Sequence, residues 1–107
     1  MKVNDFNKIV EEFLEKTKGT LIKKQEEYNL EADRFGFFKR AAAMAGNTPE
    51  QALYGFLLKH LVSLSDMVGS GKKFPKELYE EKLGDICNYL ILLRGLLEDD
   101  NMFEEKK

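Results

Sequence analysis

Apolar residues recur at helical spacing in the first half of the chain. In the first segment, about residues 4–29, positions three and four apart form one apolar stripe. This stripe comprises Phe6, Val10, Phe13, Thr17 and Leu21. A second segment, about residues 30–45, ends before Gly46, which suits a C-terminal cap. The pattern leaves open whether this segment is a separate helix or a bent continuation of the first.

The second half of the chain predicts two further helices. The third helix has a clear start, with Thr48 as N-cap, Pro49 in the first turn and Gln51 completing a capping box. The fourth begins near Pro75 and runs to about Glu98. The expected core stripes are Leu53, Leu57, Leu61, Leu64 and Val68 on the third helix, and Leu83, Ile86, Leu90, Leu93 and Leu97 on the fourth. Short connections between the helices favour an antiparallel bundle.

The fold class predicted from these patterns is all-α. We expect one helical domain over residues 1–98, built as a four-helix bundle, and a charged tail over residues 99–107 that frays. A chain of 107 residues buries only about two-thirds of its unfolded surface. Stability must therefore come from one compact core or from a core completed by a partner chain, and exposed aromatic stripes on so small a domain favour a homo-oligomer.

The composition narrows the function classes. Apolar residues make up 43% and charged residues 34% of the chain, which is typical of a globular protein with a charged surface. The net charge of −2, with basic and acidic residues interleaved, argues against nucleic-acid binding. The single cysteine, Cys87, allows no intrachain disulfide and fits a reducing compartment. With no signal-peptide pattern and no apolar run of about 18 residues, we expect a cytoplasmic protein that binds no membrane.

Several polar residues fall on or beside the stripes that should face the core. The stripe of the first helix turns polar halfway along, and the third and fourth helices each carry a polar stripe beside the apolar one. These residues are Lys24, Glu27, Tyr28, Glu31, Lys59, Ser63, Asp66, Glu81, Asp85 and Asn88. Asp85 is the most informative of them, because it interrupts the apolar run from Leu83 to Leu93. An ionised carboxylate there is costly to bury unless it is paired or bound to a metal.

The acidic members of this set have the spacing of a metal site. Two carboxylate pairs are each spaced by one helical turn, namely Glu27 with Glu31 and Glu81 with Asp85, so that each pair can reach one ion. Hard cations such as Mg²⁺ take such oxygen ligands. Lysines nearby can neutralise the phosphates that Mg²⁺ recruits. The alternative is that all these charges are solvated or form surface ion pairs, as we expect for the outward-facing residues 12 and 15.

Other motifs indicate packing. The loop at residues 69–73 lacks the full phosphate-loop pattern and reads as a turn. His60 and Cys87 are expected to pack rather than to catalyse, and Phe35, Phe37 and Phe38 to serve the core or a subunit interface.

Two stretches carry a resemblance to a known family. Residues 80–90, Glu-Glu-Lys-Leu-Gly-Asp-Ile-Cys-Asn-Tyr-Leu, resemble the second metal-binding helix of the MazG-like all-α NTP pyrophosphohydrolases. Residues 24–29, Lys-Gln-Glu-Glu-Tyr-Asn, are similar to the Lys-x-x-Asp-Tyr-Gly signature of small, phage-rich relatives associated with nucleotide modification, and Leu57-Leu58-Lys59 is similar to a third block of those relatives.

The resemblance covers about residues 24–97 and implies a four-helix protomer in a dimer or tetramer. It also implies Mg²⁺-dependent cleavage of a nucleoside triphosphate into a monophosphate and pyrophosphate. Glu27, Glu31, Glu81 and Asp85 would then be metal ligands. Lys24, Tyr28, Lys59 and Asn88 would bind the nucleotide.

Three departures from the family pattern bear on catalysis. Lys82 stands where a metal-binding carboxylate is usual, Asn29 replaces the glycine of the small relatives, and the usual Glu-x-x-Glu of the first metal helix has no clear counterpart. Three hypotheses therefore stand: a Mg²⁺-dependent pyrophosphohydrolase, a catalytically degenerate protein of the same fold that sequesters or senses a nucleotide, and a helical interaction protein of phage type.

Overall fold

The computed structural model of the protein describes residues 1–28 and 33–105, with side chains described for residues 1–24 and 33–105. Within these residues the protein is all-α and has no strand. Its four helices are α1 (Val3–Tyr28), α2 (Gly36–Ala45), α3 (Pro49–Gly69) and α4 (Lys76–Asp99). The predicted fold class, four helices packed together, is confirmed.

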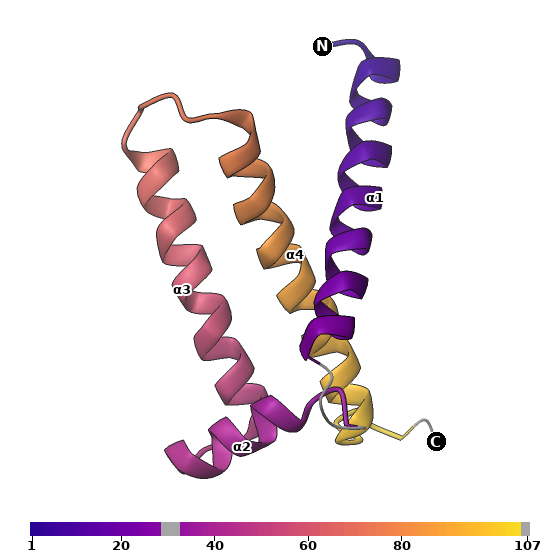
Figure 1. Ribbon diagram of the computed structural model, residues 1–107, viewed down its shortest axis with the longest axis vertical. Helices are drawn as coiled ribbons and strands as arrows, with labels where there is room; N and C mark the ends of the chain where they lie inside the picture. Colours follow the sequence, from indigo (N-terminus) through magenta and orange to yellow (C-terminus); the bar gives the residue numbers. More distant parts are fainter. Residues whose placement is uncertain (29–32, 106–107) are drawn as a thin grey trace.

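The helices pack in an open arrangement. α3 and α4 form the expected antiparallel pair, and the short α2 lies across the end of α3 (Figure 1). α1 packs against α4 and runs in the same direction as α4 (Figure 1). Among the described residues, the backbone of α1 approaches neither α2 nor α3. The antiparallel prediction thus holds for α3 and α4 but not for α1 and α4, because α2 is too short to form a full antiparallel layer.

Local signals place most helix ends where the sequence predicted them, but α2 begins at Gly36 rather than near residue 30. α1 continues through Gly19 without a break, and α2 is a separate helix rather than a continuation of α1. Gly46 caps α2 with φ of 72°, a left-handed conformation that glycine adopts without strain. At the start of α3, the Thr48 hydroxyl accepts a hydrogen bond from the Gln51 backbone N–H (3.2 Å) and the Gln51 side chain accepts one from the Thr48 N–H (2.9 Å). The predicted capping box is therefore confirmed.

The core lies where α2, α3 and the C-terminal half of α4 meet. Phe38, Leu53 and Leu96 are buried together there. The half-buried side chains packed around them are Phe35, Phe56, Tyr89, Leu92 and Leu93. The Phe35 ring covers Gly95 so closely that an added Cβ would lie 2.9 Å from the ring's Cζ atom, which explains why a glycine stands there.

The buried stripes of α3 and α4 match the predicted ones only in part, since Leu53 and Leu57 are buried and Leu93 packs against the core as predicted. On α3 the buried apolar residues are Leu53, Leu57 and Met67, whereas Leu61 is 37% and Val68 65% exposed. On α4 the buried residues are Gly84, Asn88 and Leu96, whereas Leu83 and Leu90 are exposed. Both helices carry apolar residues around more than half of their circumference, so periodicity could not decide which stripe faces inward.

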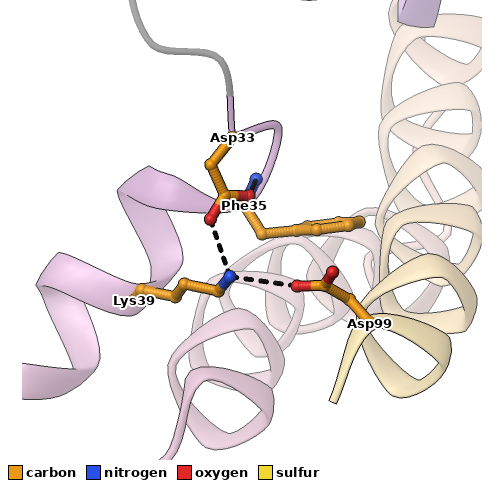
Figure 2. Close-up of polar contacts among 4 residues, drawn as sticks. All are labelled: Asp33, Phe35, Lys39 and Asp99. Carbon is orange, nitrogen blue, oxygen red and sulfur yellow. Dashed lines mark hydrogen bonds and ion pairs between the residues drawn. The ribbon is translucent and has the colours of Figure 1, made fainter. Parts of the chain in front are cut away.

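A lysine ties α2 to the end of α4 (Figure 2). The Lys39 ammonium donates to Asp33 Oδ2 (2.6 Å) and to Asp99 Oδ2 (3.0 Å), while Asp33 Oδ1 accepts from the Phe35 N–H (2.9 Å). The hydrogen bond from Lys39, followed by that from the Phe35 N–H, lowers the pKa of Asp33. This exposed network fixes the entry of α2 and so holds Phe35 against the core.

No helix in the described part of the chain is long and apolar enough to cross a membrane.

Candidate functional site

A polar groove of about 270 Å³ lies between α1 and α4. Its lining combines hydroxyl, amide, ammonium and carboxylate groups from both helices with one aromatic ring. The lining residues are Phe13, Lys16, Thr17, Thr20, Glu77, Glu80, Glu81, Gly84, Asp85 and Asn88. The two helices approach closely at Gly84, where an added Cβ would lie 3.4 Å from the Thr17 hydroxyl oxygen.

The floor of the groove holds two buried polar side chains, Thr17 and Asn88. Asn88 is only 6% exposed, and its Oδ1 atom is buried without a hydrogen-bond partner in the structure. Leaving such an oxygen unpaired costs about 1–3 kcal/mol, so buried amides are normally satisfied by protein groups, water or a ligand. Asn88 therefore brings an unpaired, buried oxygen next to the groove, and a hydrogen-bond donor or a cation that reached this oxygen would be stabilised.

The Asp85 carboxylate of α4 lies close to side chains of both α1 and α3. Its side chain is 17% exposed, and its Oδ1 atom lies 3.4 Å from the Lys24 ammonium of α1. Its Oδ2 atom lies 4.0 Å from Nδ1 of His60 on α3, a nitrogen that is itself buried without a hydrogen-bond partner. The His60 ring packs 5.1 Å from the ring of Tyr89, where burial raises the pKa of the tyrosine hydroxyl. The predicted cost of burying Asp85 is thus offset by the Lys24 ammonium, which comes from another helix.

A second ion pair closes one end of the groove. The Lys16 ammonium donates to Glu80 Oε2 at 2.8 Å, and Lys76 lies 3.7 Å from the other carboxylate oxygen of Glu80. The hydrogen bond from Lys16 lowers the pKa of Glu80, and the same bond raises the pKa of Lys16. This rim is charged and solvated, unlike the floor at Asn88.

The structure brings together about half of the predicted site residues. Glu81, Asp85 and Asn88 line the groove, and Lys24 reaches Asp85 from α1. Lys59 is exposed on α3 and is not among the lining residues. Glu27 and Tyr28 belong to α1, but their side chains lie outside the described ones, and Glu31 lies outside the described residues altogether. The expectation that the carboxylates at positions 12 and 15 face solvent is confirmed, because both residues are exposed.

Sequence reasoning missed two kinds of residue at this site. One is the set of further polar groups of the groove, Lys16, Thr17, Thr20, Glu77 and Glu80, and the other is His60, the neighbour of Asp85. Thr17 occupies a core position of the apolar stripe of α1, and a hydroxyl at a core position could have identified it as a candidate site residue. His60 comes three residues after Leu57 and seven after Leu53, which places it on the buried stripe of α3. The partner of a buried histidine on another helix cannot be read from the sequence.

The oxygen donors of the groove fit a hard divalent cation. Glu81 and Asp85 provide carboxylates one turn apart, and Asn88 adds its unpaired amide oxygen one turn further along α4. Carboxylate and amide oxygens are the ligands that Mg²⁺ takes in proteins. Within the described side chains no group of three or more histidine, cysteine or acidic residues is arranged to hold a metal ion, so an ion there would need the amide, phosphate or water as further ligands.

A comparison with known protein families, with curated proteins and with solved structures found no match for this chain. The structure therefore shows an all-helical, four-helix protein, and its function has to be argued from the groove.

Proposed function

We propose that the protein binds a nucleoside triphosphate with Mg²⁺ in the α1–α4 groove and hydrolyses it to the monophosphate and pyrophosphate. This is the activity of the MazG-like pyrophosphohydrolases that the motifs at residues 24–29 and 80–90 resemble. The observation that carries the proposal is the set of oxygen-bearing side chains Glu81, Asp85 and Asn88, which follow one another along α4 and line the groove, together with the buried, unpartnered Oδ1 atom of Asn88.

The size of the groove supports a phosphate chain as the part of the ligand that enters it. Pockets that enclose whole drug-sized ligands start at about 300 Å³, and this groove measures about 270 Å³. Its lining carries four carboxylates and the Lys16 ammonium, groups that suit a phosphate chain held through a cation. The base would then lie outside the groove, where the described residues give no indication of its identity.

Each charged residue has a role in this proposal. Glu81 and Asp85 hold the cation, with Asn88 as a neutral oxygen ligand, and Glu27 and Glu31 remain the proposed ligands from the α1 side. Bound Mg²⁺ supplies charge neutralisation of the phosphates and lowers the pKa of a bound water. The Lys24 ammonium, which pairs with Asp85 in the structure, exchanges that partner for a phosphate oxygen when the cation takes Asp85. The other oxygen of Asp85, 4.0 Å from Nδ1 of His60, stays on the α3 side of the carboxylate.

A second candidate is a protein that binds the nucleotide without hydrolysing it. The observation that favours it is the pairing of Asp85 with Lys24, since an ammonium on a metal-binding carboxylate competes with the cation. Lys82 also favours this second candidate, because the resembled family has a carboxylate at that position. A groove with fewer free carboxylates than the resembled hydrolases have can still hold a triphosphate through its lysines.

The test is pyrophosphate release from a panel of canonical and modified nucleoside triphosphates, with and without Mg²⁺. The variants are Asp85→Asn, Asn88→Leu and Lys24→Met, with Glu15→Gln as a control that removes one α1 carboxylate outside the groove. We expect Mg²⁺-dependent release that falls at least about 100-fold in Asp85→Asn, equivalent to about 2.7 kcal/mol of transition-state stabilisation, and stays unchanged in Glu15→Gln.

A thermal-shift measurement on the same proteins separates the two candidates. Nucleotide with Mg²⁺ should raise the Tm of the wild type by mass action. A Tm increase without pyrophosphate release would identify the non-hydrolysing protein. Neither a Tm increase nor release, in a folded sample, would refute nucleotide binding and support the helical interaction protein.

A further inference from the structure

Among the described side chains, Lys16 is the one basic group that lines the α1–α4 groove. Its ammonium lies among carboxylates: the hydrogen bond to Glu80 raises the pKa of Lys16 most, and the charges of Glu77 and Glu81 raise it further. Lys16 also lies outside residues 24–97, the stretch that resembles the MazG-like proteins, so the resemblance assigns it no role. The ammonium therefore needs an explanation from the groove itself.

The ion pair between Lys16 and Glu80 is open to solvent. The Lys16 side chain is 60% exposed and the Glu80 side chain 30% exposed. Glu80 has a second cationic neighbour, since the Lys76 ammonium lies 3.7 Å from its other carboxylate oxygen. Exposed ion pairs contribute little to stability, and a phosphate group carries more negative charge than a carboxylate and accepts strong hydrogen bonds from an ammonium. A phosphate in the groove can therefore take Lys16 from Glu80.

The two ammonium groups that α1 brings to α4 are separated along the groove. Lys16 pairs with Glu80, and Lys24 pairs with Asp85. The helices α1 and α4 run in the same direction (Figure 1). Glu80 and Asp85 are five residues apart, which corresponds to about 7.5 Å along the axis of α4. A chain of three phosphates is long enough to reach both ammonium groups, whereas a shorter chain held at the Asp85 end leaves Lys16 with its carboxylate.

The shape of the groove fixes the direction of such a chain. The Lys16–Glu80 pair closes one end, and the terminal phosphate is the one phosphate of a nucleotide that carries no further substituent. Since a groove of about 270 Å³ holds the phosphate chain without the nucleoside, the nucleoside leaves at the Asp85 end. The terminal phosphate then lies beside Lys16.

We propose that Lys16 binds the terminal phosphate of the ligand and thereby makes the groove selective for triphosphates over diphosphates and monophosphates. This inference rests on the proposed function and adds to it the length of the phosphate chain as the feature that is recognised. In the free protein the Glu80 carboxylate occupies the place of the terminal phosphate. When the chain binds, the Lys16 ammonium moves to a phosphate oxygen, and Glu80 keeps Lys76 as its partner.

The test measures the binding of two inorganic probes, tripolyphosphate and pyrophosphate, by isothermal titration calorimetry at one fixed concentration of free Mg²⁺. The wild type should bind tripolyphosphate at least about 10-fold more tightly than pyrophosphate, because one further hydrogen bond to a charged group is made. Lys16→Met should remove most of this preference. Lys18→Met is the matched control, since it takes the same group from an exposed position of α1 outside the groove, and it should change neither affinity.

Glu80→Gln separates a role in binding from a role in structure. Lys16→Met and Glu80→Gln break the same ion pair, so the loss of a merely structural contact would weaken binding in both. If Lys16 binds phosphate, Glu80→Gln frees its ammonium and should strengthen tripolyphosphate binding at least about 3-fold. Glu77→Gln is the control for net charge, because it removes another carboxylate of the groove, and its effect should be smaller.

Far-UV circular dichroism establishes that each variant is folded. A preference for tripolyphosphate that survives in Lys16→Met, or weaker binding in Glu80→Gln, would overturn the inference and leave nucleotide binding intact. An equal gain in Glu77→Gln and Glu80→Gln would also overturn it, because net charge alone would then act. A wild type that binds neither tripolyphosphate nor a nucleoside triphosphate would refute the proposed function together with this inference.

Discussion

Leu96 offers the sharpest test of the packing described above. It is fully buried, with an exposed fraction of 0%, and lies at the centre of the cluster with Phe38 and Leu53. In Leu96→Ala the flanking rings of Phe35, Phe56 and Tyr89 are too rigid to collapse into the space left by the lost carbons. We therefore expect a loss in the upper part of the range for buried Leu→Ala, about 3–5 kcal/mol.

This loss is large for a protein of 107 residues, whose whole stability is about 5–15 kcal/mol. The assay is urea unfolding followed by far-UV circular dichroism, with every variant at the same protein concentration, because self-association would add to the apparent stability. With a urea m value of about 1–3 kcal/mol/M, the midpoint should fall by at least about 1 M.

The matched control is Ile91→Ala, which removes the same number of carbons from an exposed position of the same helix. It should change the stability by less than about 1 kcal/mol. Equal losses in the two variants, or a loss below about 1 kcal/mol in Leu96→Ala, would refute the placement of the core between α2, α3 and α4.

Two further predictions concern the start of α3. Thr48→Ala should lower the free energy of unfolding by about 1 kcal/mol because the Gln51 N–H loses its acceptor, whereas Thr48→Ser should restore it; equal stability of the three proteins in urea unfolding would contradict the cap. The hydrogen bond with the Asp100 carboxyl and, to a smaller extent, burial raise the pKa of Glu50. Protonated Glu50 therefore stabilises the folded state at low pH. This contribution to stability is lost as the pH rises through the raised pKa. Glu50→Gln should therefore raise the Tm at neutral pH and change it little in acid, and thermal unfolding with the same Tm gain at both pH values would exclude the coupling.

The helices and their ends were predictable because local chemistry decides them. The capping box of α3 needs only Thr48 and Gln51, three positions apart, and the end of α2 needs only the left-handed conformation of Gly46. The four helices themselves follow from apolar spacing and from the two prolines near helix starts.

The candidate site was predictable only in part. Asp85 and Asn88 could be found because polar residues inside an apolar run are costly and so demand a reason. Their neighbours Lys24 and His60 come from other helices, and no spacing in the sequence relates residues 24, 60 and 85. The role of Lys59, predicted from the resemblance, is not supported by the groove, since Lys59 is exposed elsewhere on α3.

By itself the sequence determined the helical class, the helix boundaries and the presence of buried polar groups, because each depends on hydrogen bonds and spacing within a few residues. Only the tertiary structure decided which stripe of α3 and α4 faces inward. Leucines surround most of both helices, so burial of Leu53 and Leu96 and exposure of Leu61 and Leu90 depend on where α1 and α2 dock. The same docking creates the α1–α4 groove on one side of α4 and leaves Leu83 and Leu90 of that helix exposed.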